Sequence, residues 1–220
     1  MRRRVADGLR GIVFLGIALA TSCLYAAGPP GEVQEVRVQP TSRVPVLDGK
    51  LDDLAWRGAA VHGSSFVAGL HYTGSRTATV MPVVLLAYDR LSLYVAARSY
   101  TPDPSGLKAT STDGQFHWGD DLIQIFLEPF LDGRSVFYGV NAAGVTSEPG
   151  IRVGIARDAV SWTAELAIPW AKCAVKPDPG SRIGFNFVAN QTTTGDGWIS
   201  WAVLYGSAQN PERFGYLLLG

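Results

Sequence analysis

HWGDDLIQIFLEP, residues 117–129, leads from an aromatic residue and two adjacent carboxylates into a nearly continuous apolar run. An apolar run of this length that ends at a proline is typical of a buried strand in the centre of a sheet. Because neighbouring side chains of a strand point to opposite faces, Asp120 and Asp121 cannot form one acid/base pair if the strand begins there. The stretch therefore predicts a central β-strand with a polar loop at its start.

Short apolar segments separated by turn residues continue on both sides of this strand. Residues 81–100 divide into two strands around Asp89 and Arg90, and residues 181–190 alternate apolar and polar side chains. No pattern indicates a helix longer than about two turns. The sequence therefore predicts an all-β fold, an antiparallel β-sandwich of the jelly-roll kind with short helical turns. The side chains expected to face the core from these segments are Leu91, Leu93, Val95, Ala97, Ile183, Phe185 and Phe187.

The first residues have the order of a secretory signal. Three arginines at positions 2–4 precede an uncharged apolar stretch, residues 11–28, which two prolines follow. We expect cleavage after Ala26 and a domain that is secreted or periplasmic. This divides the chain into a signal peptide (1–26), a linker (27–43) and one β-sandwich domain (44–220).

Two alternatives to this cleavage are open. The apolar stretch is close to the lower limit for spanning a bilayer, so an uncleaved segment would act as an N-terminal anchor. Residues 20–23, ATSC, also resemble a lipoprotein signal in which Cys23 would be acylated. Cleavage after Ala26 leaves no segment for stable membrane insertion.

The remaining chain is weakly acidic. Residues 1–26 hold four of the 19 basic and one of the 19 acidic side chains, so the mature protein carries a net charge of −3. This charge gives no attraction for a polyphosphate backbone, and nucleic acid is not an expected partner. The only other cysteine is Cys173, so the mature chain has no partner for an intramolecular disulfide.

The sequence carries no signature of a serine hydrolase, zinc protease, phosphate-loop enzyme or dinucleotide-binding enzyme. We therefore expect that it is not an enzyme. Asp120 and Asp121 are better suited to bonding hydroxyl groups. They are also candidates for a calcium site together with oxygens from NQTTTGDG, residues 190–197. No other cofactor is expected.

Several segments occur in a characteristic order along the chain. They are VLDGKLDDLAW (46–56), LLAYDRLSLYVAARSYTPDP (85–104), WGDDLIQIFLEP (118–129), VFYGVNAAG (136–144), WTAELAIPW (162–170), GSRIGFNFVANQ (180–191), ISW (199–201) and NPERFGYLLL (210–219). Together they resemble the family 9 carbohydrate-binding modules and their DOMON-related β-sandwich relatives, which occur on exported bacterial proteins that degrade polysaccharides. The resemblance covers nearly everything from Val44 to Gly220.

The resemblance implies a binding site for an oligo- or polysaccharide. Binding members of the family grip the reducing end of a glycan between two tryptophan faces, because a pyranose offers C–H bonds to a ring and hydroxyls to polar neighbours. Trp118 stands at the position of the first tryptophan. Gln124 stands where the binding members have a glutamate, Gly139 where they have an arginine, and Ala208 near the second tryptophan.

The candidate sugar contacts are one aromatic platform, its polar neighbours and two aromatic residues that would supply another wall. They are Trp118, Asp121, Gln124, Asn190, Trp198 and Tyr205. The remaining tryptophans in the family segments are expected in the core because an indole buries a large area. They include Trp56, Trp162 and Trp170.

Two other functions stay open. A structural or assembly protein that kept the fold and lost sugar binding would explain Gly139 and Ala208. A related sandwich architecture holds haem b through methionine and histidine or lysine ligands, and Met81 is the only methionine after the signal.

Overall fold

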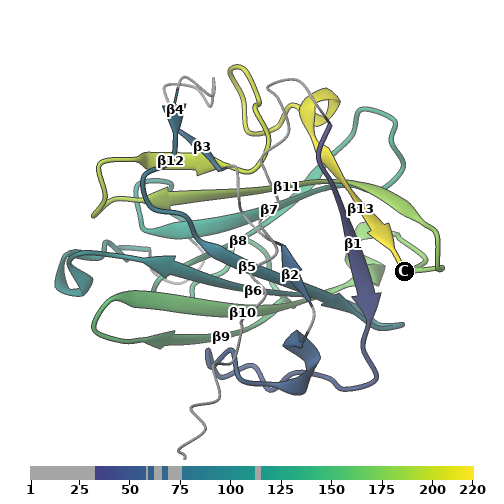
Figure 1. Cartoon of the computed structure of the whole chain (residues 1–220), viewed down its shortest axis with the longest axis horizontal. Helices are drawn as coiled ribbons and strands as arrows, with labels where there is room; N and C mark the ends of the chain where they lie inside the picture. The colour runs from purple at the N-terminus through teal and green to yellow at the C-terminus, as the bar shows by residue number, and fades with distance from the viewer. Residues whose placement is uncertain (1–32, 58, 62–65, 69–75, 112–114) are drawn as a thin grey trace, which may run out of the picture.

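The computed structural model places two β-sheets face to face (Figure 1). It describes residues 33–57, 59–61, 66–68, 76–111 and 115–220, so the predicted signal peptide, residues 1–26, lies outside the described part.

The first sheet, sheet A, has β7 (Leu122–Glu128) and β11 (Arg182–Gln191) at its centre. These two strands pair antiparallel, and β7 also pairs with β8 (Val136–Asn141). On its other edge β11 pairs first with β13 and then with β12. The remaining strands of sheet A are β3 (Val67–Ala68), β4 (Arg76–Thr77), β12 (Gly197–Ser200) and β13 (Gly215–Leu219). All seven residues of β7 are buried, which confirms it as a central strand.

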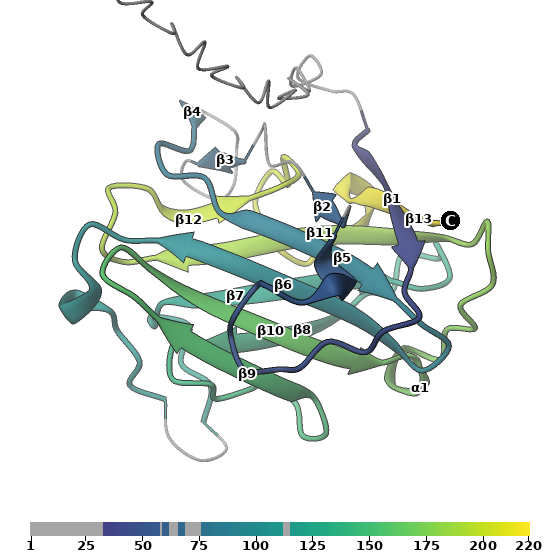
Figure 2. The same cartoon turned by 60° about the horizontal axis from the view of Figure 1, so that its bottom comes forward.

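The second sheet, sheet B, consists mainly of longer strands in the order β5-β6-β10-β9 and lies in front of sheet A (Figure 2). β6 lies between β5 and β10, and β10 also pairs with β9, all antiparallel. A short strand, β2, pairs with the far edge of β5. The bounds are β2 (Ala60–Val61), β5 (Val83–Tyr88), β6 (Ser92–Tyr100), β9 (Arg152–Arg157) and β10 (Ser161–Pro169).

β1 (Glu35–Pro40) joins the two sheets. Its first residues run parallel to β13 in sheet A, and its last two run parallel to β5 in sheet B. The sandwich is therefore mixed at this strand rather than purely antiparallel. The prediction of a linker at 27–43 is also wrong for these six residues, because the backbone groups of β1 pair with both sheets and Val38 enters the core.

Alternating side chains from the two sheets fill the core between them. Ile183, Phe185 and Phe187 enter it from β11 as predicted, and the three predicted tryptophans are buried. The prediction is wrong for Leu91, which is 74% exposed because β6 begins one residue later. The other three residues of this predicted face, Leu93, Val95 and Ala97, do lie in the core.

Residues 44–57, here called the cover, lie across the outer face of sheet B. Trp56 of the cover packs against four residues of sheet B, Ala87, Tyr94, Ala96 and Ala167. The cover is fixed by Glu165 on β10, which is fully buried. One Glu165 oxygen accepts the backbone N–H groups of Asp48 (3.0 Å) and Gly49 (2.7 Å), and the other accepts the indole N–H of Trp56 (2.8 Å). Glu165 is thus a brace carboxylate that holds the cover on sheet B.

The helical elements are short. In the part of the chain that the structure describes, they are the helix α1 (Trp170–Cys173) and the 3-10 turns η1 (Leu54–Trp56), η3 (Pro104–Gly106) and η4 (Pro211–Arg213). Within the described residues, no helix has the length and apolar character needed to cross a bilayer. Cys173 of α1 is a buried free thiol.

Candidate functional site

The outer face of sheet A collects most of the predicted contact residues. Ile123, Ile125 and Leu127 of β7 point into the core, so the alternate residue Gln124 points outward. Gln124 lies opposite Gly139 of β8 and Val188 of β11. Two residues farther along β11, Asn190 lies opposite Trp198 of β12, which places both side chains on the same outer face. Trp118 reaches this face from the turn that precedes β7.

Trp118 is half exposed, at 50% of its full area. Its ring centroid lies 5.4 Å from that of Phe116, at 85° between planes, and 5.5 Å from that of Phe137 on β8. The two phenylalanines hold the indole against the sheet while part of its surface faces solvent. Neither Phe116 nor Phe137 is among the contact residues predicted from the sequence. Phe116 could have been found from the sequence, because it is a second aromatic residue only two positions before Trp118 in the same loop.

The ring contacts continue from Trp118 across the sheet. Phe137 contacts Phe126 at 5.8 Å between centroids, and Phe126 contacts Phe214 at 6.0 Å. Tyr205 belongs to the loop beside Phe214, with the guanidinium of Arg213 5.3 Å from its ring centroid. Tyr205 is exposed, but three successive ring contacts separate Trp118 from Phe214. We therefore do not assign Tyr205 as the wall that faces Trp118.

Asp120 organises the turn that carries Trp118. Its buried carboxylate accepts backbone and hydroxyl hydrogen bonds from both Thr110 and Ser111, and one from the amide of Asn141. Burial alone would raise the pKa of Asp120, but these donors outweigh burial and hold the pKa below its ordinary value. Asp120 is therefore an ionised brace.

Asp121 is a second brace, and its prediction as a sugar contact is corrected by the structure. It is 1% exposed, and its oxygens accept from Lys108 N (2.8 Å), Thr192 N (2.8 Å) and Thr192 Oγ1 (2.6 Å). Three protein donors take up most of the roughly four lone-pair sites of this carboxylate, so Asp121 serves the loop as a brace. Asn190 also supports the turn, because its side-chain amide donates to the carbonyls of Asp120 (3.0 Å) and Trp118 (3.4 Å).

Gln124 differs from these braces. Its Nε2 atom is buried and has no hydrogen-bond partner among the described residues. Gln124 is 1% exposed, so this donor is covered although its side chain points to the outer face of sheet A. Phe116 roofs the neighbouring Gly139, since a Cβ at Gly139 would lie 2.7 Å from the end of the Phe116 ring. The space that an arginine would use at position 139 is thus filled by Phe116.

The acidic residues do not converge on a cation. Within the described ranges, no group of three or more His, Cys, Asp or Glu side chains has the arrangement of a metal site. Asp196, in the stretch proposed to supply calcium ligands, accepts instead from Arg76, Thr79 and Val80. The oxygens considered for calcium are therefore bonded to protein donors.

Met81 packs against the main core. This environment is that of a core methionine and does not favour a haem ligand.

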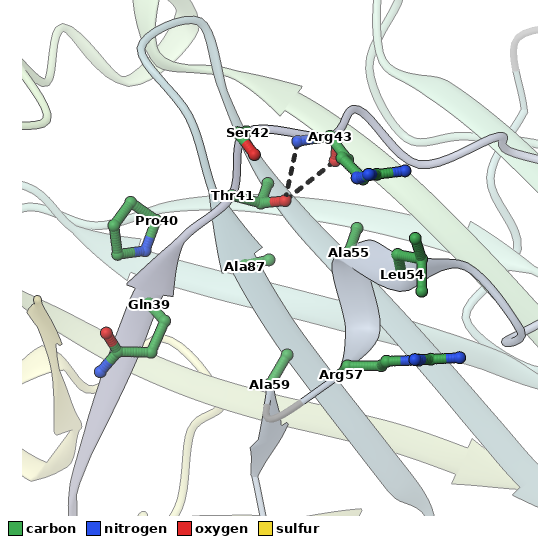
Figure 3. Close-up of a pocket in the computed structure, with 10 residues that line it drawn as sticks. All are labelled: Gln39, Pro40, Thr41, Ser42, Arg43, Leu54, Ala55, Arg57, Ala59 and Ala87. Carbon is green, nitrogen blue, oxygen red and sulfur yellow. Dashed lines mark hydrogen bonds between the residues drawn. The ribbon is translucent and has the colours of Figure 1, made fainter.

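A separate hollow of about 220 Å³ lies on sheet B beside the end of β1 (Figure 3). Ala55, Ala59 and Ala87 line it, and the Arg43 and Arg57 side chains extend away from Gln39 and Pro40 on its other side. The residues that line it include no aromatic ring and no carboxylate. It offers neither a stacking platform nor an acid/base pair, so the outer face of sheet A is the better candidate.

No protein-family model and no curated protein matches the sequence, whereas solved structures do. A family 9 carbohydrate-binding module from Caldicellulosiruptor kristjanssonii in complex with cellotriose matches with a TM-score of 0.63 and 23% identity over 84% of this chain and 93% of that chain. Its complex with glucose matches with a TM-score of 0.63 and 23% identity over 85% and 96%. A protein from Bacteroides uniformis ATCC 8492, proposed to bind carbohydrate, matches with a TM-score of 0.62 and 16% identity over 86% and 100%. The all-β sandwich and its resemblance to family 9 modules are thereby confirmed as a matter of fold.

Proposed function

We propose that this chain, folded like the family 9 carbohydrate-binding modules, binds glycans without cleaving them and stacks one sugar ring on Trp118. The observation that carries the proposal is the half-exposed indole, held by Phe116 and Phe137 and turned partly to solvent. An indole face that is open to solvent offers a partner an apolar surface on which a sugar ring can stack. The cellotriose and glucose complexes of the matched module support a sugar as that partner.

Gln124 supports the same surface. A buried amide nitrogen without a partner is rare in a folded protein, since leaving it unsatisfied costs about 1–3 kcal/mol. A sugar hydroxyl that reached this nitrogen would satisfy it. Trp198 extends the apolar part of the surface, because it packs partly buried against the cluster that contains Phe126.

The mode of binding differs from a slot between two tryptophans. Phe116 occupies the space above Gly139, and Ala208 is packed into the apolar cluster instead of presenting a second indole. The platform is consequently open on the side away from Phe116 and Phe137. An open platform favours the face of a sugar within a chain over a fully enclosed chain end.

The chemistry of the site fits binding rather than catalysis. Glycoside hydrolysis uses two carboxyl groups that flank the scissile bond. The two carboxylates nearest the platform, Asp120 and Asp121, are both buried and bonded to loop donors. They hold the loop that presents Trp118, and a separate hydrolase would supply the cleavage.

We also propose that the domain works outside the cytoplasm, after removal of the N-terminal signal at Ala26. The support is the order of basic and apolar residues at positions 2–28. The mass of the exported product tests this. A product that begins near Ala27 agrees with cleavage, whereas one that begins at Cys23 with acyl chains establishes lipidation.

The binding proposal is tested by Trp118→Ala. We expect affinity for soluble oligosaccharides to fall roughly five- to a hundred-fold, the loss of about 1–3 kcal/mol that removal of an aromatic contact causes. Folding stability should fall by only about 1–2 kcal/mol, because half of the indole is already exposed. Calorimetric titration with glucose, cellotriose and a panel of neutral plant oligosaccharides measures the affinity, and thermal melts measure the folding stability.

Phe130→Ala is the matched control. Phe130 is an aromatic residue 59% exposed in the turn after β7, at the other end of the strand from Trp118. Its removal should leave binding unchanged. If the wild type binds no member of the panel, or if both variants bind equally well, the platform does not bind sugar.

An assembly role is the second candidate, favoured by the filled space over Gly139. An aromatic surface that kept the fold but lost its sugar would bind protein instead. A mature protein that binds no glycan and whose oligomers dissociate on Trp118→Ala would establish this alternative.

A further inference from the structure

A second hollow, of about 570 Å³, lies at the end of the sandwich where the last residues of β6 meet two turns. The turns are those between β9 and β10 and between β11 and β12, and both lie toward the left in Figures 1 and 2, near the η3 loop. Its walls include Thr79, Tyr100, Thr101, Val160 and Thr193. The volume is within the range of about 300–1,000 Å³ typical of small-ligand sites.

Tyr100 gives this hollow an aromatic wall. The tyrosine is 37% exposed at the last position of β6, and Val160, whose carbonyl accepts the N–H of the next residue, Thr101, is 57% exposed beside it. Tyrosine combines an apolar ring face with a polar tip, which suits a ligand that is itself apolar on one face and polar at its rim.

Threonine hydroxyls provide the polar part of the walls. The Oγ1 atoms of Thr101 and Thr193 lie 2.6 Å apart. Each hydroxyl has one proton, so one of the two protons remains available whichever residue donates. Val80, Pro102, Thr194 and Gly195 complete the lining, and none of the residues that line the hollow carries a charge.

The wall at Thr79 is fixed before any ligand arrives. The buried carboxylate of Asp196 accepts the backbone N–H of Thr79 (2.6 Å), its hydroxyl (2.8 Å) and the N–H of Val80 (2.9 Å). A wall held in this way loses little conformational entropy on binding.

The turn between β11 and β12 connects this hollow with the Trp118 platform. Thr193 lines the hollow, while the preceding Thr192 is bonded to Asp121 and Asn190 is bonded to the carbonyl of Trp118. From residue 190 to residue 193 the backbone spans at most about 11 Å. The hollow and the platform therefore lie on two sides of one short segment.

We propose that this hollow is a second sugar subsite, in which Tyr100 stacks a neutral pyranose and the threonine hydroxyls bond its rim. The inference rests on the proposed function, because it extends a glycan bound at Trp118 around the β11–β12 turn. The uncharged walls favour a neutral polysaccharide over one built from uronic acids or sulfated sugars. The open form of the hollow accepts a residue within a chain.

The test follows both subsites separately by NMR on the mature protein. The probes are di- and hexasaccharides of neutral plant glycans, beginning with cellobiose and cellohexaose, and an oligogalacturonate as the charged probe. We expect cellohexaose to shift the indole N–H signal of Trp118 and the amide signals of residues 193–195. The disaccharide should shift mainly the signal of Trp118.

Variants then assign the second subsite to the tyrosine. Tyr100→Ala should weaken hexasaccharide binding roughly three- to ten-fold, as expected for one aromatic contact, and leave disaccharide binding unchanged. Tyr100→Phe, which keeps the ring face, should retain most of the affinity. Leu91→Ala removes an exposed side chain at the opposite end of β6 and should change neither.

The outcomes separate the two proposals. If the hexasaccharides shift Trp118 but leave residues 193–195 and the affinity of Tyr100→Ala unchanged, the second subsite is refuted and the platform stands. If none of the neutral probes shifts either region, both are refuted. Tighter binding of the oligogalacturonate than of the neutral probes in the hollow would overturn the assignment of a neutral ligand.

Discussion

Replacing Glu165 by alanine should be the most destabilising single change on the outer side of sheet B. Glu165 is fully buried, and no ion pair among the described residues includes it. Its removal orphans the N–H groups of Gly49 and Trp56, whose bonds to it are buried, and that of Asp48, whose bond is partly buried. Two buried orphaned donors at about 1–3 kcal/mol each give an expected loss of about 2–6 kcal/mol. This is a large part of the roughly 5–15 kcal/mol that stabilises a typical domain.

The pH dependence gives a second measure of the same group. Burial raises the pKa of Glu165, and the three N–H donors only partly oppose it. A carboxyl group whose pKa is higher in the folded state than in the unfolded state stabilises the fold most below the unfolded value, about 4.3. That contribution is lost as pH rises through the folded pKa. Glu165→Gln cannot ionise, so the free energy of unfolding of wild type relative to this variant should fall over the same interval.

Urea unfolding followed by tryptophan fluorescence measures both effects. Trp56 also reports whether the cover detaches before the sheets unfold, because its indole is bonded to Glu165. Glu35→Ala is the control: Glu35 is paired with Arg182 at 3.6 Å on the surface, and its loss should cost less than about 1 kcal/mol. If Glu165→Ala unfolds at the same urea concentration as Glu35→Ala, the cover is not anchored by this carboxylate.

Two further predictions concern the loop and strand that present Trp118. Gly139→Ala should lower the free energy of unfolding by about 1–2 kcal/mol, because the new methyl group meets the Phe116 ring. In a protein that also carries Phe116→Ala, the same substitution should cost almost nothing. Equal costs with and without the Phe116 ring, measured by urea unfolding, would show that the ring does not fill this space. Asp120→Asn should destabilise the protein by about 2 kcal/mol or more at pH 7. The pKa of Asp120 is lower in the folded than in the unfolded protein, so its carboxylate stabilises the fold above the unfolded pKa of about 3.9, and this stabilisation is lost as pH falls below that value. The difference in free energy of unfolding between wild type and Asp120→Asn should therefore be smaller at pH 3 than at pH 7. A difference that stays constant would contradict the ionised brace.

The core could be predicted from the sequence wherever a strand alternates regularly. Phe185 and Phe187 follow the alternation through β11, and both are buried. Leu91 fits the same alternation but still belongs to the turn at Asp89, because its N–H donates to the Asp89 side chain. The strand β6 begins only at the next residue, Ser92. β1 was missed for another reason. It shows only one fully buried residue, Val38, and its pairing partner β13 lies at the far end of the chain.

The candidate site was predictable in part. Trp118 was identified from its segment, but Phe137 contacts it from a different strand, and only the register of β7 with β8 brings the two together. Asp121 was misjudged because its donors, Lys108 and Thr192, are distant in sequence. The sequence shows that a carboxylate is present. Whether its oxygens already accept hydrogen bonds from the protein depends on contacts that form only in the folded chain.

β13 has a consequence for when the chain can fold. It fills the gap between β11 and β1, so the strand nearest the beginning of the domain waits for residues 215–219 before its sheet A partner exists. Pairings that span nearly the whole described chain close late and slow the search for the native state. During synthesis from the N-terminus, the sandwich therefore stays open until its final strand has left the ribosome.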